Sequence, residues 1–235
     1  MKDNSFAGNL YVVTGASRGI GRSISELLLQ RGAEVVGVGR NEKKLREIER
    51  RHSGFSYIVM DLSRPKAGEE LARQLKGVGV HGLINNAGYA YWGDPLKVPV
   101  EEYRRMTQLL YLTPIELSHS LLPELKGGVV VNVISAIVHV RFRRMTGYGA
   151  AKSALHYYTV GARKYYKKRG VHLMAVYPGP VKTDFFSHPS FEGEVDLLRG
   201  FSVTPEKVAR ATLGGIKRKA CSIYVPWYLR VISLR

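Results

Sequence analysis

Two residues four positions apart, Tyr148 and Lys152, have the types and the spacing that proton transfer needs. On a helix, residues at this spacing share one face. A tyrosine has an unperturbed pKa of about 10, and a nearby ammonium group favours its ionised form and lowers that pKa. Ser135 precedes them at the end of an expected strand, where its hydroxyl can point into a cleft. Together these groups could deliver a proton to a carbonyl oxygen and stabilise the negative charge that hydride transfer builds there.

A glycine-rich segment earlier in the chain suits phosphate binding. It reads Thr14-Gly15-Ala16-Ser17-Arg18-Gly19-Ile20-Gly21 and stands between an expected strand and an expected helix. Glycines at such a turn let the backbone approach a pyrophosphate closely, and the helix N-terminus supplies free N–H donors. A tight turn without a ligand is the alternative interpretation.

Alternating elements must position these groups. The apolar runs predict strands at 9–14, 34–39, 55–60, 81–86, 129–134, 171–177 and 222–225, and the helical periods predict helices at 20–31, 42–51, 67–76, 100–125, 148–168 and 205–217. The helix at 100–125 should bend near Pro114. Continuous apolar strands are typical of parallel sheets covered on both faces. We therefore predict an α/β fold, a single-domain Rossmann-type doubly wound parallel sheet of about seven strands flanked by helices on both faces, over residues 1–235.

The order of the motifs resembles that of the short-chain dehydrogenase/reductase family. The matching segments run over about residues 8–220 and are Thr14-Gly15-x-x-x-Gly19-x-Gly21, Asp61-Leu62, Asn85-Asn86-Ala87-Gly88, Ser135, Tyr148-Gly-Ala-Ala-Lys152 and Pro178-Gly179-Pro180-Val181-Lys182-Thr183. The resemblance implies an oxidoreductase that transfers a hydride between a nicotinamide cofactor and a carbonyl or alcohol, such as a ketone or aldehyde reductase for a 3-oxoacyl or ring compound. It implies Tyr148 as acid or base, Lys152 as the group that lowers its pKa and binds the nicotinamide ribose, and Ser135 as the group that orients the substrate oxygen.

The end of the second expected strand bears on the choice of cofactor. An acidic residue there would hold the ribose 2′-OH of NAD and repel a 2′-phosphate, but this strand ends Val38-Gly39-Arg40, and Arg18 lies in the glycine turn. Two guanidinium groups without a carboxylate favour NADP(H), unless both are simply exposed to solvent. The cofactor-binding residues that the resemblance implies are Gly15, Ser17, Arg18, Gly19, Ile20, Gly21, Arg40, Asp61, Leu62, Asn86, Ala87, Gly88, Tyr148, Lys152, Pro178, Gly179, Val181 and Thr183.

Aromatic residues and one long loop predict an apolar substrate pocket. We expect its wall to contain Tyr89, Tyr91, Trp92, Ser135, Ile137 and Phe185, although the first three could merely anchor their own loop. The irregular stretch at 182–203 should close over the substrate. The basic run at 141–144 could attract an anionic substrate, and a solvated charged surface is the alternative. No cluster of residues has metal-ligand spacing, so no metal is expected.

One position departs from the family pattern. Many members carry an asparagine that holds a water molecule in a proton relay to the lysine, and here Leu110 stands at that position. A leucine side chain cannot hydrogen-bond a water, so Thr107 or Thr113 would have to hold the relay. The alternative function is therefore an NADP(H)-binding sensor or scaffold with weak catalysis.

The charge of the chain is strongly positive. It contains 36 Lys and Arg against 19 Asp and Glu, a formal net charge of +17, which attracts polyanions. No nucleic-acid-binding motif appears, so no specific nucleic acid is expected, and a basic nucleic-acid binder stays a third hypothesis. The tail at 222–235 mixes basic residues with Trp227 and Tyr228, as membrane-surface segments do. Packing of the tail on its own domain or on a partner subunit is the alternative.

The remaining expectations concern location and partners. The single cysteine, Cys221, cannot form an internal disulfide and fits a reducing compartment. No apolar run of about 18 residues suggests a membrane span, and the first residues leave no room for a signal peptide. We expect a cytoplasmic protein, with peripheral membrane contact through the tail as an option, that forms a homodimer or homotetramer and acts on a small-molecule substrate.

Overall fold

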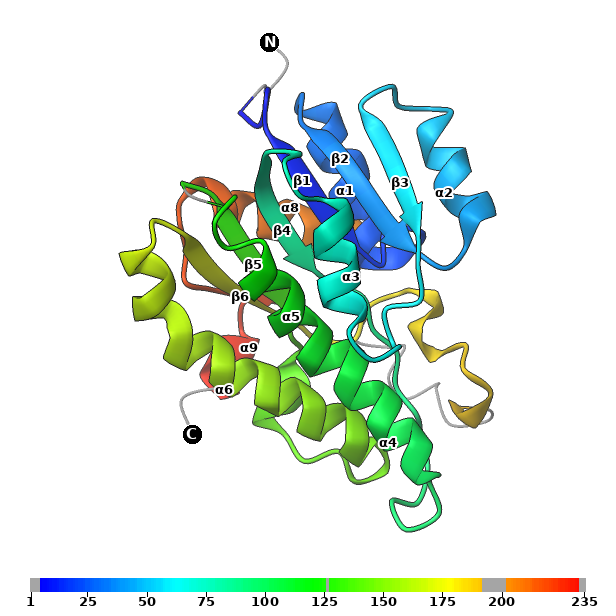
Figure 1. Cartoon of the computed structure of the whole chain (residues 1–235). Helices are drawn as coiled ribbons and strands as arrows, with labels where there is room; N and C mark the ends of the chain where they lie inside the picture. Colours follow the sequence, from blue (N-terminus) through cyan, green and yellow to red (C-terminus); the bar gives the residue numbers. More distant parts are fainter. Residues whose placement is uncertain (1–4, 126, 192–201, 233–235) are drawn as a thin grey trace.

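A seven-stranded sheet forms the centre of the computed structural model, which describes residues 5–125, 127–191 and 202–232 (Figure 1). Its strands are β1 (Leu10–Thr14), β2 (Glu34–Gly39), β3 (Phe55–Val59), β4 (Val80–Asn85), β5 (Val129–Val133), β6 (His172–Pro178) and β7 (Ser222–Val225). They lie in the order β3-β2-β1-β4-β5-β6-β7, and every neighbouring pair is parallel. The predicted fold class is confirmed.

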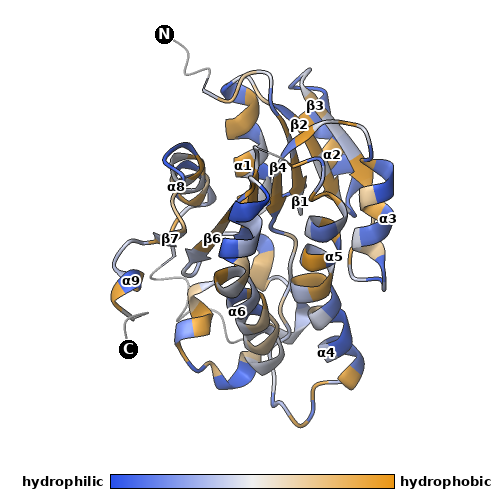
Figure 2. Cartoon of the chain, turned by 60° about the vertical axis from the view of Figure 1, so that its left-hand side comes forward, coloured by the Kyte–Doolittle hydropathy of each residue, from blue (hydrophilic) through white to orange (hydrophobic). Residues whose placement is uncertain are grey.

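Helices cover both faces of this sheet. They are α1 (Gly19–Gln30), α2 (Glu42–Glu49), α3 (Ala67–Gln74), α4 (Val100–Thr107), α5 (Thr113–Ser120), α6 (Thr146–Lys168), α8 (Pro205–Lys217) and α9 (Leu229–Ile232). Successive strand residues point to opposite faces, so Val13 packs with α1 and α8 while Val12 packs with α3 and α5. Figure 2 shows the result, with hydrophobic strands inside and hydrophilic residues on the outer helix faces.

The chain order creates a crevice between β1 and β4. From β1 the chain moves outward to β2 and β3, and it then crosses to β4 on the other side of β1. The loops that follow β1 and β4 therefore separate at the carboxyl edge of the sheet, where such folds bind ligands. Thr14 ties the two strand ends together, because its Oγ1 accepts hydrogen bonds from Asn86 N at 2.9 Å and Ala87 N at 3.0 Å.

The helical stretch predicted at 100–125 runs without a break from Val100 to Ser120 and ends five residues earlier than predicted. Between α4 and α5 lies a π-helical segment, η1 (Gln108–Leu112), and α5 ends at Ser120. The Thr113 N–H bonds to Gln108 O, five residues back. Pro114 follows and has no N–H to donate to Leu110, so the regular hydrogen-bond pattern is broken just before it. The predicted bend is therefore present as a local widening of the helix.

The C-terminal segment forms β7 and the short helix α9. Trp227 is 77% exposed and Val231 61% exposed, whereas the side chain of Leu229 lies beside Gly179 at the sheet edge. Residues 233–235 of the predicted tail lie outside the described residues. Within the described part of the chain, no helix combines the length and the apolar character needed to span a bilayer.

Candidate active site

A cavity of about 820 Å³ follows the carboxyl edge of the sheet. One end is lined by the glycine turn and the start of α2, and the other by Ser135, Tyr148 and the segment after β6. All the cofactor-binding residues predicted from the sequence line this cavity except Gly21. The structure thus brings together residues that are up to 168 positions apart, from Gly15 to Thr183.

The glycine turn fits a ligand that must approach the backbone. Gly15 has a φ of +70° and Gly19 a φ of +55°, which disfavours side chains there. A β-carbon on Gly15 would lie 2.9 Å from Ala87 Cα, and one on Gly19 would lie 2.9 Å from Thr183 Cγ2. Gly21 acts from behind the turn, because a β-carbon there would lie 2.3 Å from Gly15 O. Gly21 therefore allows α1 to pack closely on the turn, although Gly21 itself does not line the cavity.

Three cations lie at the end of the cavity formed by α1, β2 and α2. Arg18 and Arg40 line it as predicted, and Lys44, in the first turn of α2, lines it as well. Gly39, at the end of β2, offers no carboxylate to this region. The sequence analysis did not name Lys44, although a helix that begins at Glu42 places this lysine close to Arg40. Such a cluster can bind a phosphate group.

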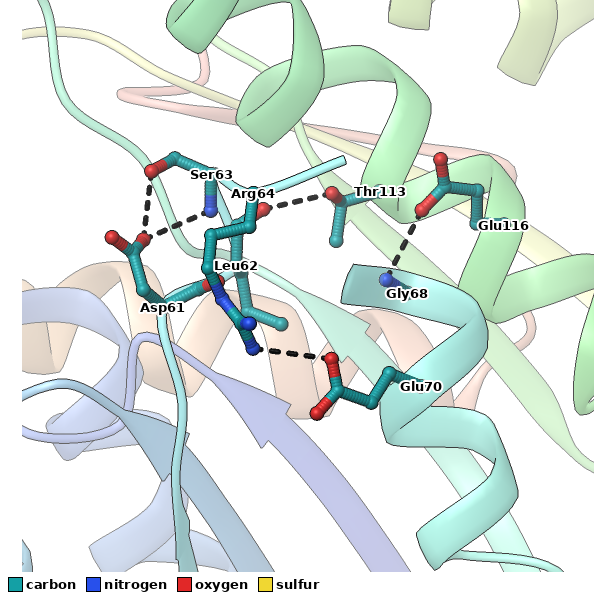
Figure 3. A network of polar contacts seen from close by, with 8 residues as sticks. All are labelled: Asp61, Leu62, Ser63, Arg64, Gly68, Glu70, Thr113 and Glu116. Carbon is teal, nitrogen blue, oxygen red and sulfur yellow. Dashed lines mark hydrogen bonds and ion pairs between the residues drawn. The ribbon is translucent and has the colours of Figure 1, made fainter. Parts of the chain in front are cut away.

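Asp61 and Leu62 are held by a polar network that spans β3, α3 and α5 (Figure 3). Asp61 Oδ1 accepts hydrogen bonds from Ser63 N at 3.0 Å and Ser63 Oγ at 2.7 Å. Thr113 Oγ1 donates to Leu62 O at 2.9 Å. Burial alone would raise the pKa of Asp61, but the bonds from Ser63 and the nearby Arg40 outweigh it and leave the pKa below its usual range. Asp61, which lines the cavity, therefore carries a carboxylate fixed by Ser63.

The residues with proton-transfer chemistry meet at the other end. Tyr148 is 7% exposed and Lys152 4% exposed, and the Tyr148 hydroxyl is hydrogen-bonded to the Ser135 side chain. Lys152 Nζ lies 6.0 Å from the centroid of the Tyr148 ring and donates to Val133 O at 2.7 Å. The site therefore unites the three residues on one wall.

The expected lowering of the tyrosine pKa is wrong for the protein without cofactor. Burial raises the pKa of Tyr148 to about 12, and the hydrogen bond from Ser135 opposes this only in part. Burial also lowers the pKa of Lys152 to about 7, so near neutral pH the lysine carries only part of the charge that would favour tyrosinate. Tyr148 therefore stays neutral in this state, and Lys152 is only partly charged.

The surroundings of Leu110 are apolar. Leu110 is fully buried and packs with Met106, Met145 and Tyr148. The threonines proposed as substitutes do not fill its place. Thr107 is exposed, and Thr113 Oγ1 is committed to Leu62 O and to Gln108 Nε2. Neither threonine is therefore free to take the place of the relay asparagine.

The substrate side of the cavity is apolar, but the predicted aromatic wall is wrong in two members. Tyr89, Ser135, Ile137 and Phe185 line the cavity, whereas Tyr91 and Trp92 do not. Trp92 instead packs on Phe142 and Phe191, and Tyr91 packs on His188. Both residues anchor their loop to the segment after β6, which was the alternative interpretation. Phe186, from the loop expected to close over the substrate, lines the cavity as well, and the wall residues that the sequence reasoning did not include are Val140, Phe142, Met145 and Leu229.

Only part of the predicted substrate loop can be placed. The helical turns η4 (Asp184–Phe186) and η5 (Pro189–Phe191) follow β6, and η2 (Ala136–His139) and η3 (Arg143–Met145) follow β5. The ring centroid of Phe185 lies 5.4 Å from that of Tyr148 in an edge-on contact. Residues 192–201 of the loop lie outside the described residues. Across the described ranges, no three His, Cys, Asp or Glu side chains lie close enough to hold a metal.

Comparison with known proteins identifies the family. The model of the family described as short chain dehydrogenase matches residues 9–191. The chain belongs to this family. It is 32% identical over 187 residues to the NADPH-dependent 3-dehydrocapnine reductase of Ornithobacterium rhinotracheale, covering 74% of this chain and 66% of the relative.

Two solved structures show the same fold. A short-chain dehydrogenase from Sphingobium yanoikuyae in complex with NADPH has a TM-score of 0.86 at 23% identity, covering 96% of this chain and 92% of the other. A short-chain dehydrogenase/reductase from Burkholderia phymatum in complex with NAD has a TM-score of 0.85 at 21% identity, covering 98% and 93%. The family match makes this chain an oxidoreductase, and the two solved structures, one with NADPH and one with NAD, share its fold.

Proposed function

We propose that this protein is an NADP(H)-dependent oxidoreductase that interconverts a carbonyl compound and an alcohol. The main support for this proposal is that one cavity is lined by both sets of residues. Ser135, Tyr148 and Lys152 line one end, and the glycine turn and three cations form the other. When bound, the nicotinamide supplies or accepts the hydride. In the direction of reduction, the Tyr148 hydroxyl gives its proton to the substrate oxygen, and the Ser135 hydroxyl donates a hydrogen bond to that oxygen.

The reaction is tested with one variant and a matched control. NADPH oxidation is followed by its absorbance against a panel of ketones and aldehydes. Tyr148→Phe should lower turnover by about 10²–10⁴-fold, because the proton donor is gone, while the affinity for NADPH stays unchanged. Tyr157→Phe is the control, since Tyr157 lies on the same helix α6 but is 83% exposed. Equal turnover in Tyr148→Phe and wild type would refute the proposal.

The preference for NADP(H) is supported by the charges around β2. Arg18, Arg40 and Lys44 line the cavity end, and β2 ends at Gly39 without a carboxylate. The carboxylate of Glu42, which also lines this end, is paired with Arg46. The relative named an NADPH-dependent reductase is in line with this choice. Arg40→Ala should raise the Kd of NADPH about 10–100-fold, since hydrogen bonds to charged groups contribute about 1.5–3 kcal/mol, with little effect on NADH. Arg51→Ala, an exposed change beyond the end of α2, is the control.

The substrate proposal is an apolar ketone or aldehyde, such as a ring or 3-oxoacyl compound. Ile137, Val140, Phe142, Phe185 and Phe186 surround the space beside Tyr148 with apolar surface, which favours apolar ligands. Long-chain and cyclic ketones should give higher kcat/KM than small keto acids of equal reactivity. A preference for the small acids would point instead to the exposed basic run at 141–144.

A sensor or scaffold is the alternative function that Leu110 suggested, and relatives named as a dehydrogenase and a reductase do not favour it. In that case NADPH would bind tightly without turnover on any carbonyl compound of the panel. The homodimer or homotetramer, the cytoplasmic location and the membrane contact of the tail stay predictions. Sedimentation at several concentrations tests the first, and flotation with anionic vesicles tests the last.

A further inference from the structure

An acidic side chain from the substrate loop lies between two of the cations assigned to the cofactor. Asp184, the first residue of η4, places its Oδ2 3.7 Å from Arg18 Nη1 and 3.6 Å from Lys44 Nζ. Both cations line the cavity, whereas Asp184 itself does not. The carboxylate thus engages the two cations from outside the cavity, at the end of the site that is remote from Tyr148.

Local structure fixes Asp184 in this place. Thr183 packs on Gly19, since a β-carbon at that glycine would meet Thr183 Cγ2 at 2.9 Å. Thr183 Oγ1 also accepts a hydrogen bond from Phe185 N at 3.2 Å and so caps η4. One residue earlier, Lys182 N donates to Val203 O at 2.9 Å. The chain on the N-terminal side of Asp184 is therefore anchored to the glycine turn and to residue 203.

The same two cations are those that a 2′-phosphate would need. A phosphate monoester carries a charge of about −1.5 to −2 near neutral pH, and Arg18, Arg40 and Lys44 are the cations that line this end. The Asp184 carboxylate neutralises part of that positive charge and would repel the phosphate. NAD(H) carries no 2′-phosphate, so the carboxylate should hardly affect its binding.

We infer that Asp184 is a specificity-determining residue that opposes NADP(H) by competing with the 2′-phosphate for Arg18 and Lys44. This inference rests on the proposed NADP(H) preference and refines it. The ion pairs are exposed, with side chains 40–56% accessible, and exposed pairs contribute little to stability. Arg18 and Lys44 can therefore leave Asp184 and bind the 2′-phosphate without disturbing the fold. The ion pairs with Asp184 lower the affinity for NADP(H) and leave the stability of the fold almost unchanged.

The test measures binding and does not need the substrate. NADPH and NADH are titrated into wild type and Asp184→Asn, with the intrinsic fluorescence of the protein or of the reduced cofactor as the signal. Asp184→Asn should bind NADPH about 3–10-fold more tightly and NADH with unchanged affinity. Asp94→Asn is the control, because Asp94 is an exposed loop carboxylate that does not line the cavity. Circular dichroism melting checks that each variant folds.

Two further measurements separate competition from a general change of charge. In a Lys44→Met background, Asp184→Asn should give a smaller gain in NADPH affinity, because one of the two contested cations is missing. The gain should also shrink between about 0.1 M and 1 M salt, as the Debye length falls from about 10 Å to 3 Å. A gain that is independent of both Lys44 and salt overturns the inference.

The outcomes also distinguish this inference from the proposed function. If wild type prefers NADPH but Asp184→Asn leaves the NADPH affinity unchanged or weakens it, then Asp184 does not compete with the phosphate, and only the inference fails. If wild type binds NADH as tightly as NADPH and Arg40→Ala affects neither, the NADP(H) proposal itself fails.

Discussion

The buried ammonium group of Lys152 should make the stability of the cofactor-free protein depend on pH. This side chain is 4% exposed, its hydrogen bond goes to Val133 O, and burial lowers its pKa from 10.5 to about 7. In the unfolded chain the lysine keeps its proton up to about pH 10.4. Between these values the unfolded state binds more protons than the folded state, so the free energy of unfolding rises with pH.

The size of this effect follows from the two pKa values. The gap between 10.5 and about 7 corresponds to roughly 5 kcal/mol of destabilisation when the lysine is fully protonated in both states. Part of this destabilisation disappears as the pH rises, because the buried lysine loses its proton. From pH 7 to pH 9 the free energy of unfolding should increase by about 2 kcal/mol, which corresponds to about 4–8 °C in melting temperature for a chain of this size.

Urea or thermal unfolding of the cofactor-free protein at pH 7 and pH 9 measures this increase in the free energy of unfolding. Lys152→Met should remove the rise, whereas Lys97→Met, a change at an exposed position, should keep it. The variant loses the hydrogen bond to Val133 O, worth about 1 kcal/mol at either pH, so the readout is the pH dependence and not the absolute stability. The same pH dependence in wild type and Lys152→Met would show that the buried lysine stays protonated at pH 9 and would refute the reasoning.

Two other substitutions test the glycine turn and the missing relay. Gly21→Ala would place its β-carbon 2.3 Å from Gly15 O. We therefore expect a loss of stability of about 1–3 kcal/mol and more than about tenfold weaker NADPH binding. Gly149→Ala is the control and should change neither, because a β-carbon there would meet no atom within 4 Å. Leu110→Asn should raise turnover, because it supplies a side chain that can hold a relay water beside Lys152, and should lower stability by about 1–3 kcal/mol. Denaturation and NADPH oxidation rates check both, and an unchanged turnover in Leu110→Asn would mean that proton transfer does not wait for a relay.

The sheet could be predicted because its strands carry their own signal. Runs such as Val129-Val130-Val131 are apolar on both faces and end where motif residues begin. The π-helical segment before Pro114 could not be predicted in the same way. The proline indicates a bend, but the form of the bend depends on Gln108, whose side chain reaches Thr113 and Glu116 at 3.1 Å each.

The site residues also differ in how far the sequence predicts their positions. Those in motifs that follow strands line one cavity, since parallel strands bring their carboxyl ends to one edge. Trp92 does not line the cavity because its position depends on a distant segment, through the hydrogen bond from its backbone N–H to Ser190 Oγ at 2.9 Å and the contact of its ring with Phe191. The Asp184 ion pairs were missed for the same reason, because they join residues from three elements that only the folded chain brings together.

The buried state of Lys152 and Tyr148 connects cofactor binding with catalysis. Leu110 packs with Tyr148 in an apolar cluster, and burial keeps Tyr148 neutral and leaves Lys152 only partly charged near pH 7. A neutral lysine cannot assist ionisation of the tyrosine. The ribose hydroxyls of a bound nicotinamide would offer hydrogen-bond partners to the Lys152 ammonium, which would favour its charged form. The acid–base pair would therefore be assembled only after the cofactor is bound, and a protein that binds NADPH without turnover would be one in which this recovery of charge does not occur.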